Sequence, residues 1–183
     1  FDKEALKILK KKKNLRIIDS SYIKLDAEQS LISNNNNILI QSNDFKVFSK
    51  KDFTVVSKLK PSKKIMENLI FAFNVCRFVK SNAIVLSKNY RTLGIGSGQP
   101  SRIDSCKIAI DKMNTFFKDT NKKDICAASD AFFPFIDGIQ KLVFGGVSAI
   151  IQPSGSIRDK EVIKFANKLG IILVFSKTRH FKH

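Results

Sequence analysis

Apolar residues in the second half of the chain recur with helical spacing in some segments and form short continuous runs in others. Ser62 is a residue type that caps helices, and apolar positions three and four apart follow it as far as Val79, which predicts a helix. A second stripe of the same spacing predicts a helix over 103–117. Two short apolar runs between these helices, at 83–86 and 92–95, predict a hairpin.

Helical and strand patterns alternate in the last third of the chain. We expect a strand, a helix, a strand, a helix and a strand, in that order, over 125–128, 137–144, 147–151, 158–169 and 171–175. Gly170 is well placed to end the last helix. One helix, a hairpin and three helix–strand units predict a mixed sheet with helices on its faces. The fold class is therefore α/β.

The first 60 residues are less regular. A helix is predicted over 3–13 and a strand over 15–18. Short strands and loops are expected over 23–56, where a run of Asn residues is typical of a loop. Pro61 and Ser62 open the second half, so we divide the chain into residues 1–60 and 61–183.

Lysine dominates the charge of the chain. The formal net charge is +17, and the 33 basic residues comprise 27 Lys and only 6 Arg. One interpretation is a polyanionic partner such as nucleic acid. The other, which we favour, is a Lys-rich solvated surface that reflects AT-rich codons, because phosphate and base recognition relies on the bidentate Arg side chain. A small anionic ligand is compatible with this charge.

Cysteine usage and hydropathy argue against several other classes. Cys76, Cys106 and Cys126 stand apart with no His at ligand spacing, so the sequence predicts no zinc site and indicates a reducing, cytoplasmic setting. No apolar run approaches the roughly 20 residues of a membrane helix. The chain begins Phe-Asp-Lys-Glu, without an initiator Met or a signal sequence, and we interpret this start as a cut end.

Four loops are rich in glycine and polar residues, and they follow or precede predicted strands, where ligand sites of such sheets lie. They cover residues 80–82, 94–102, 129–135 and 152–158. Gly94, Gly96 and Gly98 admit two readings, a bend from strand to helix or an anion site at a helix start. They lack the spacing of a dinucleotide motif and of a P-loop.

Aromatic and basic residues in two of the segments leave further alternatives open. Phe132, Phe133 and Phe135 share one loop, where they would be either core residues or a stacking wall for a flat heterocycle. The tail over 179–183 would be either frayed or folded back to deliver Arg179 to a phosphate.

Five motifs, taken in order, carry a resemblance to a known family. They are Lys-Ser-Asn-Ala-Ile-Val at 80–85, the run over 94–102, Ser-Asp-Ala-Phe-Phe-Pro-Phe at 129–135, Gln-Pro-Ser-Gly-Ser at 152–156 and Arg-His-Phe-Lys-His at 179–183. Together they resemble the transformylase domain of the AICAR transformylase/IMP cyclohydrolase family. The resemblance spans nearly the whole chain and is weakest over residues 20–50.

The resemblance implies an activity, a fold and partners. The family transfers a formyl group from 10-formyltetrahydrofolate to the amine of AICAR, giving formyl-AICAR in purine (IMP) biosynthesis. Residues 61–183 would form a cytidine-deaminase-like repeat without zinc, and residues 1–60 the end of the preceding subdomain. The IMP cyclohydrolase domain would lie outside this chain. Homodimers with shared active sites are implied, with neither nucleic acid nor a membrane as partner.

The resemblance also implies site residues. AICAR would contact Asn82, Arg102, Phe132 and Arg179. Asn82 would lie closest to the reacting amine and assist catalysis, Phe132 would hold the carboxamide through its backbone, and Arg179 would bind the phosphate.

Other residues would serve the cosubstrate and a cation. Folate would be bordered by Ile103, Asp137, Ser156 and Ile157, with Asp137 hydrogen-bonded to its heterocycle. Some family members bind potassium, and here Ser81 and Asp130 would neighbour that ion.

The chemistry needs a group that this chain does not supply. The AICAR amine is a poor nucleophile, so attack on the formyl carbon requires a base and oxyanion stabilisation. A Lys-His pair provides these in the family, upstream of the position that matches Phe1. Lys182-His183, at the end of this chain, belongs to the tail motif and does not correspond to that catalytic pair. We therefore expect the isolated chain to be inactive. The rival hypotheses are a folded non-catalytic remnant, a basic nucleic-acid-binding module and a zinc nucleoside deaminase.

Overall fold

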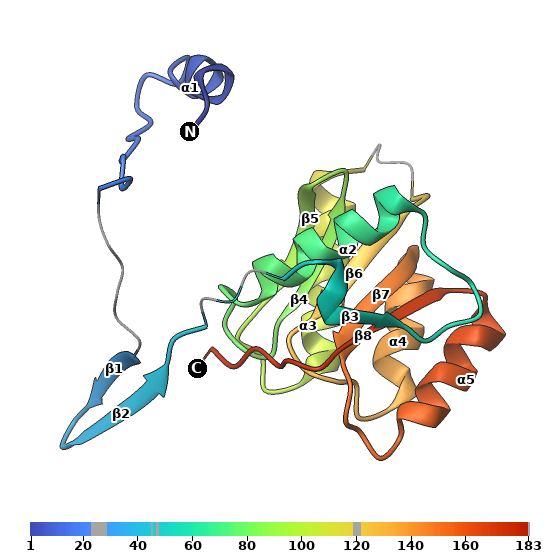
Figure 1. The fold of residues 1–183 in the computed structure, drawn as a ribbon. Helices are drawn as coiled ribbons and strands as arrows, with labels where there is room; N and C mark the ends of the chain where they lie inside the picture. Colours follow the sequence, from blue (N-terminus) through green and yellow to red (C-terminus); the bar gives the residue numbers. More distant parts are fainter. Residues whose placement is uncertain (23–28, 45, 47, 119–121, 183) are drawn as a thin grey trace. The chain divides into compact units, whose positions relative to one another are not determined.

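The computed structural model describes residues 1–22, 29–44, 46, 48–118 and 122–182, and the chain divides into two compact units (Figure 1). The first unit covers Phe1–Asn43 and the second covers Asp44–His183. This division falls earlier than the predicted one, because Phe48, Phe53 and Val55 pack in the core of the second half. The subdomain boundary at residue 60 stays a prediction about the longer protein.

The first unit contains one short helix and a hairpin. Helix α1 spans Lys3–Leu9, and the Asp2 side chain caps it by accepting a hydrogen bond of 2.7 Å from the Ala5 N–H. Strands β1 (Gln29–Asn34) and β2 (Asn37–Ser42) pair in antiparallel fashion. The turn between them takes a positive φ at Asn35, which Asn tolerates better than most residues.

Two predictions for this unit need correction. The helix ends at Leu9 and not at residue 13, because the run of four Lys that follows has no apolar position to bury. The strand predicted over 15–18 is wrong: no described strand pairs with it, and the Leu15 and Ile18 side chains are exposed. This apolar segment therefore does not form part of a described sheet.

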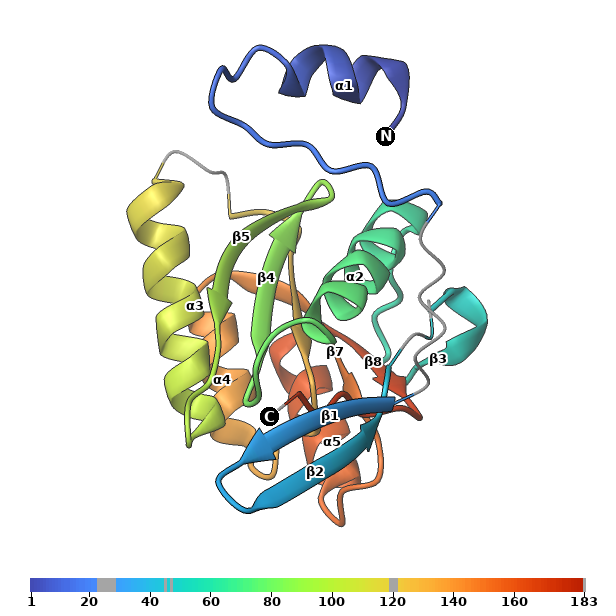
Figure 2. The same ribbon diagram turned by 90° about the vertical axis from the view of Figure 1, so that its left-hand side faces the viewer.

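The second unit is a six-stranded mixed sheet with helices on both faces, which confirms the predicted α/β class (Figures 1 and 2). The strands are β3 (Phe53–Val55), β4 (Ile84–Lys88), β5 (Arg91–Gly96), β6 (Ile125–Ser129), β7 (Val147–Pro153) and β8 (Ile172–Ser176). Their order is β3-β8-β7-β6-β4-β5. Strands β6, β7 and β8 run parallel, and β3, β4 and β5 are antiparallel to their neighbours.

Successive residues of the strands serve two separate cores. Helix α2 (Lys63–Cys76) covers one face, where Leu69 and Phe73 pack with Val85. The other face is covered by α3 (Arg102–Phe116), α4 (Ile136–Phe144) and α5 (Asp159–Leu169), whose apolar side chains pack against Ile84 and Leu86. No described helix is both long and apolar enough to cross a membrane.

Two glycines of β5 allow α3 to approach this edge strand closely. A Cβ at Gly94 would lie 2.0 Å from the carbonyl oxygen of Ala109, and one at Gly96 would lie 1.9 Å from that of Ser105. Neither glycine has a positive φ. Their purpose is therefore backbone contact between β5 and α3, which sets the position of the helix start that carries Arg102.

Candidate functional site

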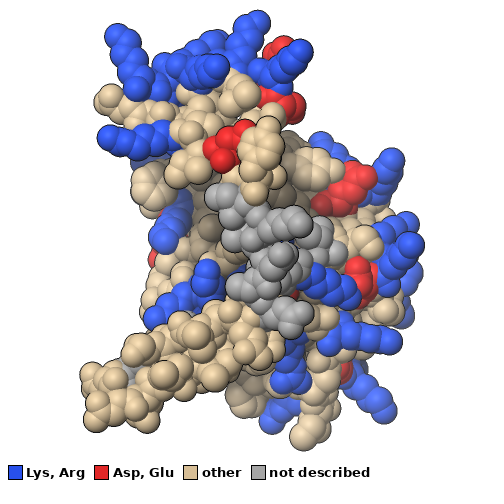
Figure 3. All heavy atoms as spheres, turned by 60° about the vertical axis from the view of Figure 1, so that its left-hand side comes forward, with Lys and Arg blue, Asp and Glu red and all other residues tan. Residues whose placement is uncertain are grey.

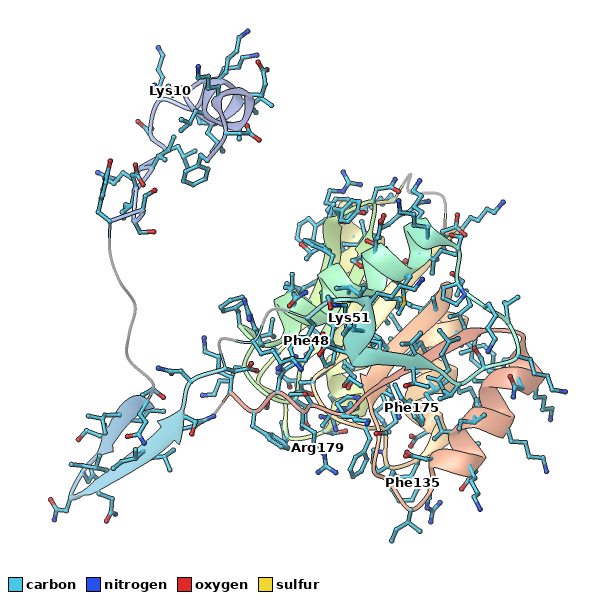
Figure 4. The ribbon with its side chains drawn as sticks, viewed as in Figure 1. Lys10, Phe48, Lys51, Phe135, Phe175 and Arg179 are labelled. Atoms are coloured by element: carbon cyan, nitrogen blue, oxygen red, sulfur yellow. The ribbon has the colours of Figure 1, made fainter. Side chains whose placement is uncertain are left out.

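The glycine-rich and polar loops meet at one end of the sheet because of its strand directions. Strands β6, β7 and β8 are parallel, so the loops after Ser129, Pro153 and Ser176 leave the same edge. Strand β4 starts there and β5 ends there, because Ile84 pairs with both Ser129 and Gly96. The side chains of Phe135 and Arg179 lie at this end of the unit in Figure 4. Sheet topology thus gathers segments that are up to 100 residues apart in the sequence.

Asp130 ties three of these segments together. Its side chain is completely buried, and the Ser81 hydroxyl donates to one carboxylate oxygen at 2.7 Å. Nη2 of Arg102 donates to the other oxygen at 2.6 Å, forming an ion pair. The backbone N–H of His180 donates to the Asp130 carbonyl at 2.9 Å. The loop before β4, the start of α3 and the C-terminal tail are therefore fixed to the loop after β6.

The Arg102 guanidinium uses each of its nitrogens on a protein partner. Besides the Asp130 contact, Nε donates to the Ser129 hydroxyl at 3.0 Å and Nη1 donates to the Phe132 carbonyl at 3.4 Å. The Arg102 side chain is 13% exposed. In this state Arg102 holds the 129–132 backbone in shape, and its exposed edge lines the cavity described below.

Asn82 has an orientation set by its own hydrogen bonds. Its Nδ2 donates to the carbonyls of Gln99 at 2.8 Å and Pro100 at 3.2 Å, so the assignment of nitrogen and oxygen follows from the acceptors. The Asn82 carbonyl accepts from the Ser105 hydroxyl at 2.7 Å. Within the described chain nothing donates to Oδ1, so this oxygen is free to accept a hydrogen bond from a ligand N–H.

A cavity of about 420 Å³ lies between the loop that enters α3 and the loop that enters α4. It is lined by Asn82, Pro100, Ser101, Arg102, Ile103, Phe133, Pro134, Phe135 and Asp137. Of the aromatic loop, Phe133 is buried in the core as one reading expects, whereas Phe135 is half exposed at the cavity, with the Arg158 guanidinium 4.6 Å from its ring centre. The stacking role stays a prediction. Such a volume, with apolar walls and few polar groups, is in the range of small-molecule sites.

The tail places Arg179 beside the same loop. The Arg179 guanidinium lies 4.6 Å from the centre of the Phe132 ring, a cation–π contact. A Cβ built on Gly155 would come within 3.3 Å of Nη2 of Arg179, and Gly155 has a φ of +104°. The tail is therefore folded back and not frayed, and the Gly155 backbone lies so close to the guanidinium that a Cβ there would be tight.

The structure does not bring every expected residue into the cavity. Ile103 and Asp137 line it with Asn82 and Arg102, whereas Ser156 and Ile157 lie in the loop between β7 and α5. The Ser156 hydroxyl accepts from the Arg158 N–H at 3.1 Å, and the Ile157 side chain is fully exposed. The Ser156 hydroxyl thus stabilises a turn within the loop, and the residue that caps α5, Arg158, makes no side-chain cap hydrogen bond.

The two residues expected beside a potassium ion both carry oxygen donors. Ser81 and Asp130 are hydrogen-bonded partners, which suits a hard cation by donor type, although Arg102 already neutralises the carboxylate. Among the residues that the structure describes, no three His, Cys, Asp or Glu side chains gather as a metal cluster.

Some residues that build the site were not assigned this role from the sequence. Ser105, within α3, donates to the Asn82 backbone carbonyl, and Ser129, which opens the motif over 129–135, accepts from Arg102. His180 and Asp44 form a pair 136 residues apart. Only the folded topology brings such residues together.

Positive charge is not gathered into a single patch on the face that Figure 3 draws. On the face drawn in Figure 3, Lys and Arg side chains are scattered, with acidic side chains between them. Arg102 lines the cavity, and the Arg158 guanidinium lies 4.6 Å from the ring centre of Phe135, which lines it too. Both are Arg residues, in a chain that has only 6. This agrees with the reading of the Lys excess as solvated surface.

Fold and site together define the class of protein. It is an α/β domain with a cavity of small-molecule size between the loops at one end of a mixed sheet. The chain belongs to the AICARFT/IMPCHase bienzyme family, whose pattern matches residues 1–112.

Curated relatives extend the similarity over the whole chain. The bifunctional purine biosynthesis protein PurH of Buchnera aphidicola subsp. Schizaphis graminum is 47% identical over 187 residues, covering 100% of this chain and 35% of that protein. PurH of Fusobacterium nucleatum is 46% identical and PurH of Lactococcus lactis (strain MG1363) 41%, each over 100% of this chain. The chain spans about a third of the length of these relatives.

Proposed function

We propose that this chain is the substrate-binding part of an AICAR transformylase, which moves a formyl group from 10-formyltetrahydrofolate to the amine of AICAR. The observation that carries the proposal is the convergence on Asp130 of the segments that hold Asn82, Arg102, Phe132 and Arg179. Family membership supplies the reaction, and the relatives' printed name supplies purine biosynthesis as its setting.

Asn82 is proposed as the residue nearest the chemistry. Its free Oδ1 would accept a hydrogen bond from the AICAR amine, which orients the nitrogen lone pair toward the formyl carbon. The Phe132 backbone would hold the carboxamide, and the Arg179 guanidinium would pair with the phosphate. Ile103 and Asp137 would face the folate heterocycle across the cavity.

The general base of the reaction is assigned to a part of the protein outside this chain. The base and the oxyanion stabiliser would come from the Lys-His pair that the family resemblance implies. The 183-residue chain alone is accordingly proposed to bind ligands without turnover. A homodimer, a cytoplasmic location and potassium beside Ser81 and Asp130 belong to the same proposal.

The experiment is a titration of the full-length protein with AICAR, followed by calorimetry, combined with the rate of formyl transfer. Arg179→Ala is expected to weaken AICAR binding by at least about tenfold, because a charge-assisted phosphate contact is lost. Asn82→Ala is expected to lower kcat by about a hundredfold or more with a smaller change in affinity. Lys177→Ala, an exposed cation two residues before Arg179, is the control. Unchanged AICAR affinity in Arg179→Ala would contradict the assigned phosphate site.

A further inference from the structure

The C-terminal tail has one buried side chain between exposed neighbours. His180 is 1% exposed, while Arg179 before it and Phe181 after it are exposed. Terminal residues are usually loose unless something anchors them. The burial of His180 identifies it as the anchor.

The His180 ring lies in a box of aromatic and acidic groups. Its centroid is 4.4 Å from that of Phe73 on α2 and 5.3 Å from that of Phe48. Its Nδ1 is hydrogen-bonded to the carboxylate of Asp44. The segment that carries Phe48 is itself fixed to α2, because the Phe48 N–H donates to the Asn74 side chain at 3.1 Å.

The tail backbone is held on both sides of this ring. The His180 N–H donates to the Asp130 carbonyl, and the Lys182 carbonyl accepts from the Ser81 N–H at 2.8 Å. Asp130 also pairs with Arg102 through its side chain. Arg179 is the residue next to this anchor, and its guanidinium reaches the Phe132 ring 4.6 Å away.

The charged groups that bear on the ring are Asp44 from the segment before β3, Asp130 from the loop after β6 and Arg77 from the end of α2. Burial lowers the pKa of His180 below 6.5, and this outweighs the two carboxylates, which act to raise it. Nε2 is buried and has no partner among the described residues. The neutral ring, with Nδ1–H donating to Asp44, is therefore the form that suits the box.

We propose that His180 is a positioning residue, whose neutral ring locks the tail between Asp44 and Phe73 and so holds Arg179 at the substrate site. This rests on the function proposed above. Docking of the tail depends on pH in one direction, because protonation of His180 would bury an Nε2–H without an acceptor. The docked tail thus loses stability as pH falls below 6.5, the value for an exposed ring.

The test uses full-length protein and the dissociation constant for AICAR, measured by calorimetry at pH 7.5 without folate. His180→Phe keeps a buried ring and removes the donor to Asp44, which is itself one-third exposed and can be solvated. We expect affinity to fall by about tenfold. His180→Asn places an amide N–H near the position of Nδ1, and it is expected to bind within about threefold of the wild type.

A pH series separates positioning from a purely structural role. The substrate phosphate titrates with a pKa of about 6 and affects every variant equally. Between pH 7.5 and 5.5, wild-type affinity should therefore fall more steeply than that of His180→Asn, which has no titrating ring. If His180→Phe fails to fold, the comparison of the wild type with His180→Asn still tests the positioning role of His180.

Three outcomes would overturn the proposal. They are wild-type affinity in His180→Phe, an equal loss in His180→Asn and His180→Phe, and parallel pH curves for wild type and His180→Asn. Each of these would leave the weakened binding of Arg179→Ala in place, so the proposed function would survive. An Arg179→Ala variant with normal affinity would instead remove the proposed phosphate site, and this inference with it.

Discussion

Asp130 is a fully buried carboxylate that is acceptable to the fold only because donors satisfy both of its oxygens. Burying a charge is costly, and removing one member of a buried pair leaves the other uncompensated. The Arg102–Asp130 pair is thus a weak source of net stability but a strong constraint on geometry. Both loops that line the cavity depend on it.

This constraint predicts strong coupling between the two residues. Arg102→Met and Asp130→Asn are each expected to lower the free energy of unfolding by about 3–5 kcal/mol, and the double variant by clearly less than the sum. Urea denaturation of the four proteins measures the coupling. The exposed pair of Asp104 and Lys107, at 3.0 Å, is the control and should show coupling below about 1 kcal/mol. Additive effects at Arg102 and Asp130 would refute the argument.

A second prediction at this scale concerns Gly96. In Gly96→Ala the new Cβ would lie 1.9 Å from the Ser105 carbonyl oxygen, so α3 has to move. We expect a loss of about 1–3 kcal/mol or more in the free energy of unfolding, measured in urea. Ser97→Ala, in the next position, removes only a 3.3 Å hydrogen bond to the Lys80 carbonyl and should cost less than 1.5 kcal/mol. Equal stability of the two variants would contradict the close-packing role.

At the scale of elements, sequence reasoning succeeded where a segment carries its own signal. The helix from Ser62 was predicted because its cap and its apolar stripe are local, and α2 buries Leu69, Phe73 and Cys76 as expected. The alternating helices and strands after residue 120 were predicted for the same reason. The sheet class follows from their order.

The sequence pattern does not show which strands pair at long range. Strand β3 lies in the stretch where short strands were expected, but its partner β8 is more than 100 positions later. The segment 15–18 has an equally apolar pattern but no described strand to pair with. In the candidate site, motifs located the loops, whereas the contacts of Asp130 with Ser81, Arg102 and His180 depend on the folded sheet.

The β1–β2 hairpin carries a prediction about assembly. The cross-strand pair Leu31 and Ile40 is 69% and 59% exposed, and Ile38 and Leu39 are also open to solvent. Exposed apolar surface of this kind marks an interface. Leu31→Ser with Ile40→Ser is expected to shift the proposed homodimer of the full-length protein toward monomer, as measured by sedimentation equilibrium. Leu59→Ser, which alters a 50% exposed residue of the second unit, is the control. An unchanged dimer would exclude the hairpin from the interface.

At the scale of the whole molecule, the three thiols report on the integrity of the second unit. Cys76, Cys106 and Cys126 are free and buried, on both faces of the sheet. Burial raises the pKa of Cys106 and of Cys126 to about 12, and raises that of Cys76 as well. Because the thiolate is the reactive form, native thiols should be inert at pH 8.

This can be checked with a chromogenic thiol reagent. We expect no prompt reaction in the folded chain at pH 8, and reaction of all three thiols once urea unfolds it. The rate in water then measures opening of the sheet core. Prompt modification of a single thiol in the native protein would contradict the packing described for that residue.

Convergence on Asp130 also bears on how such a site can change over generations of a lineage. Independent loops can drift one at a time, each tolerating its own replacements. Here the Ser81 loop, the start of α3 and the tail share one attachment point. A lineage that lost this carboxylate would have to replace two attachments together, those of Ser81 and Arg102, while the tail would keep its bond to the backbone carbonyl. Ligand preference is therefore expected to vary through residues that only face the cavity, such as Ile103 and Phe135, while the attachment itself is inherited as a block.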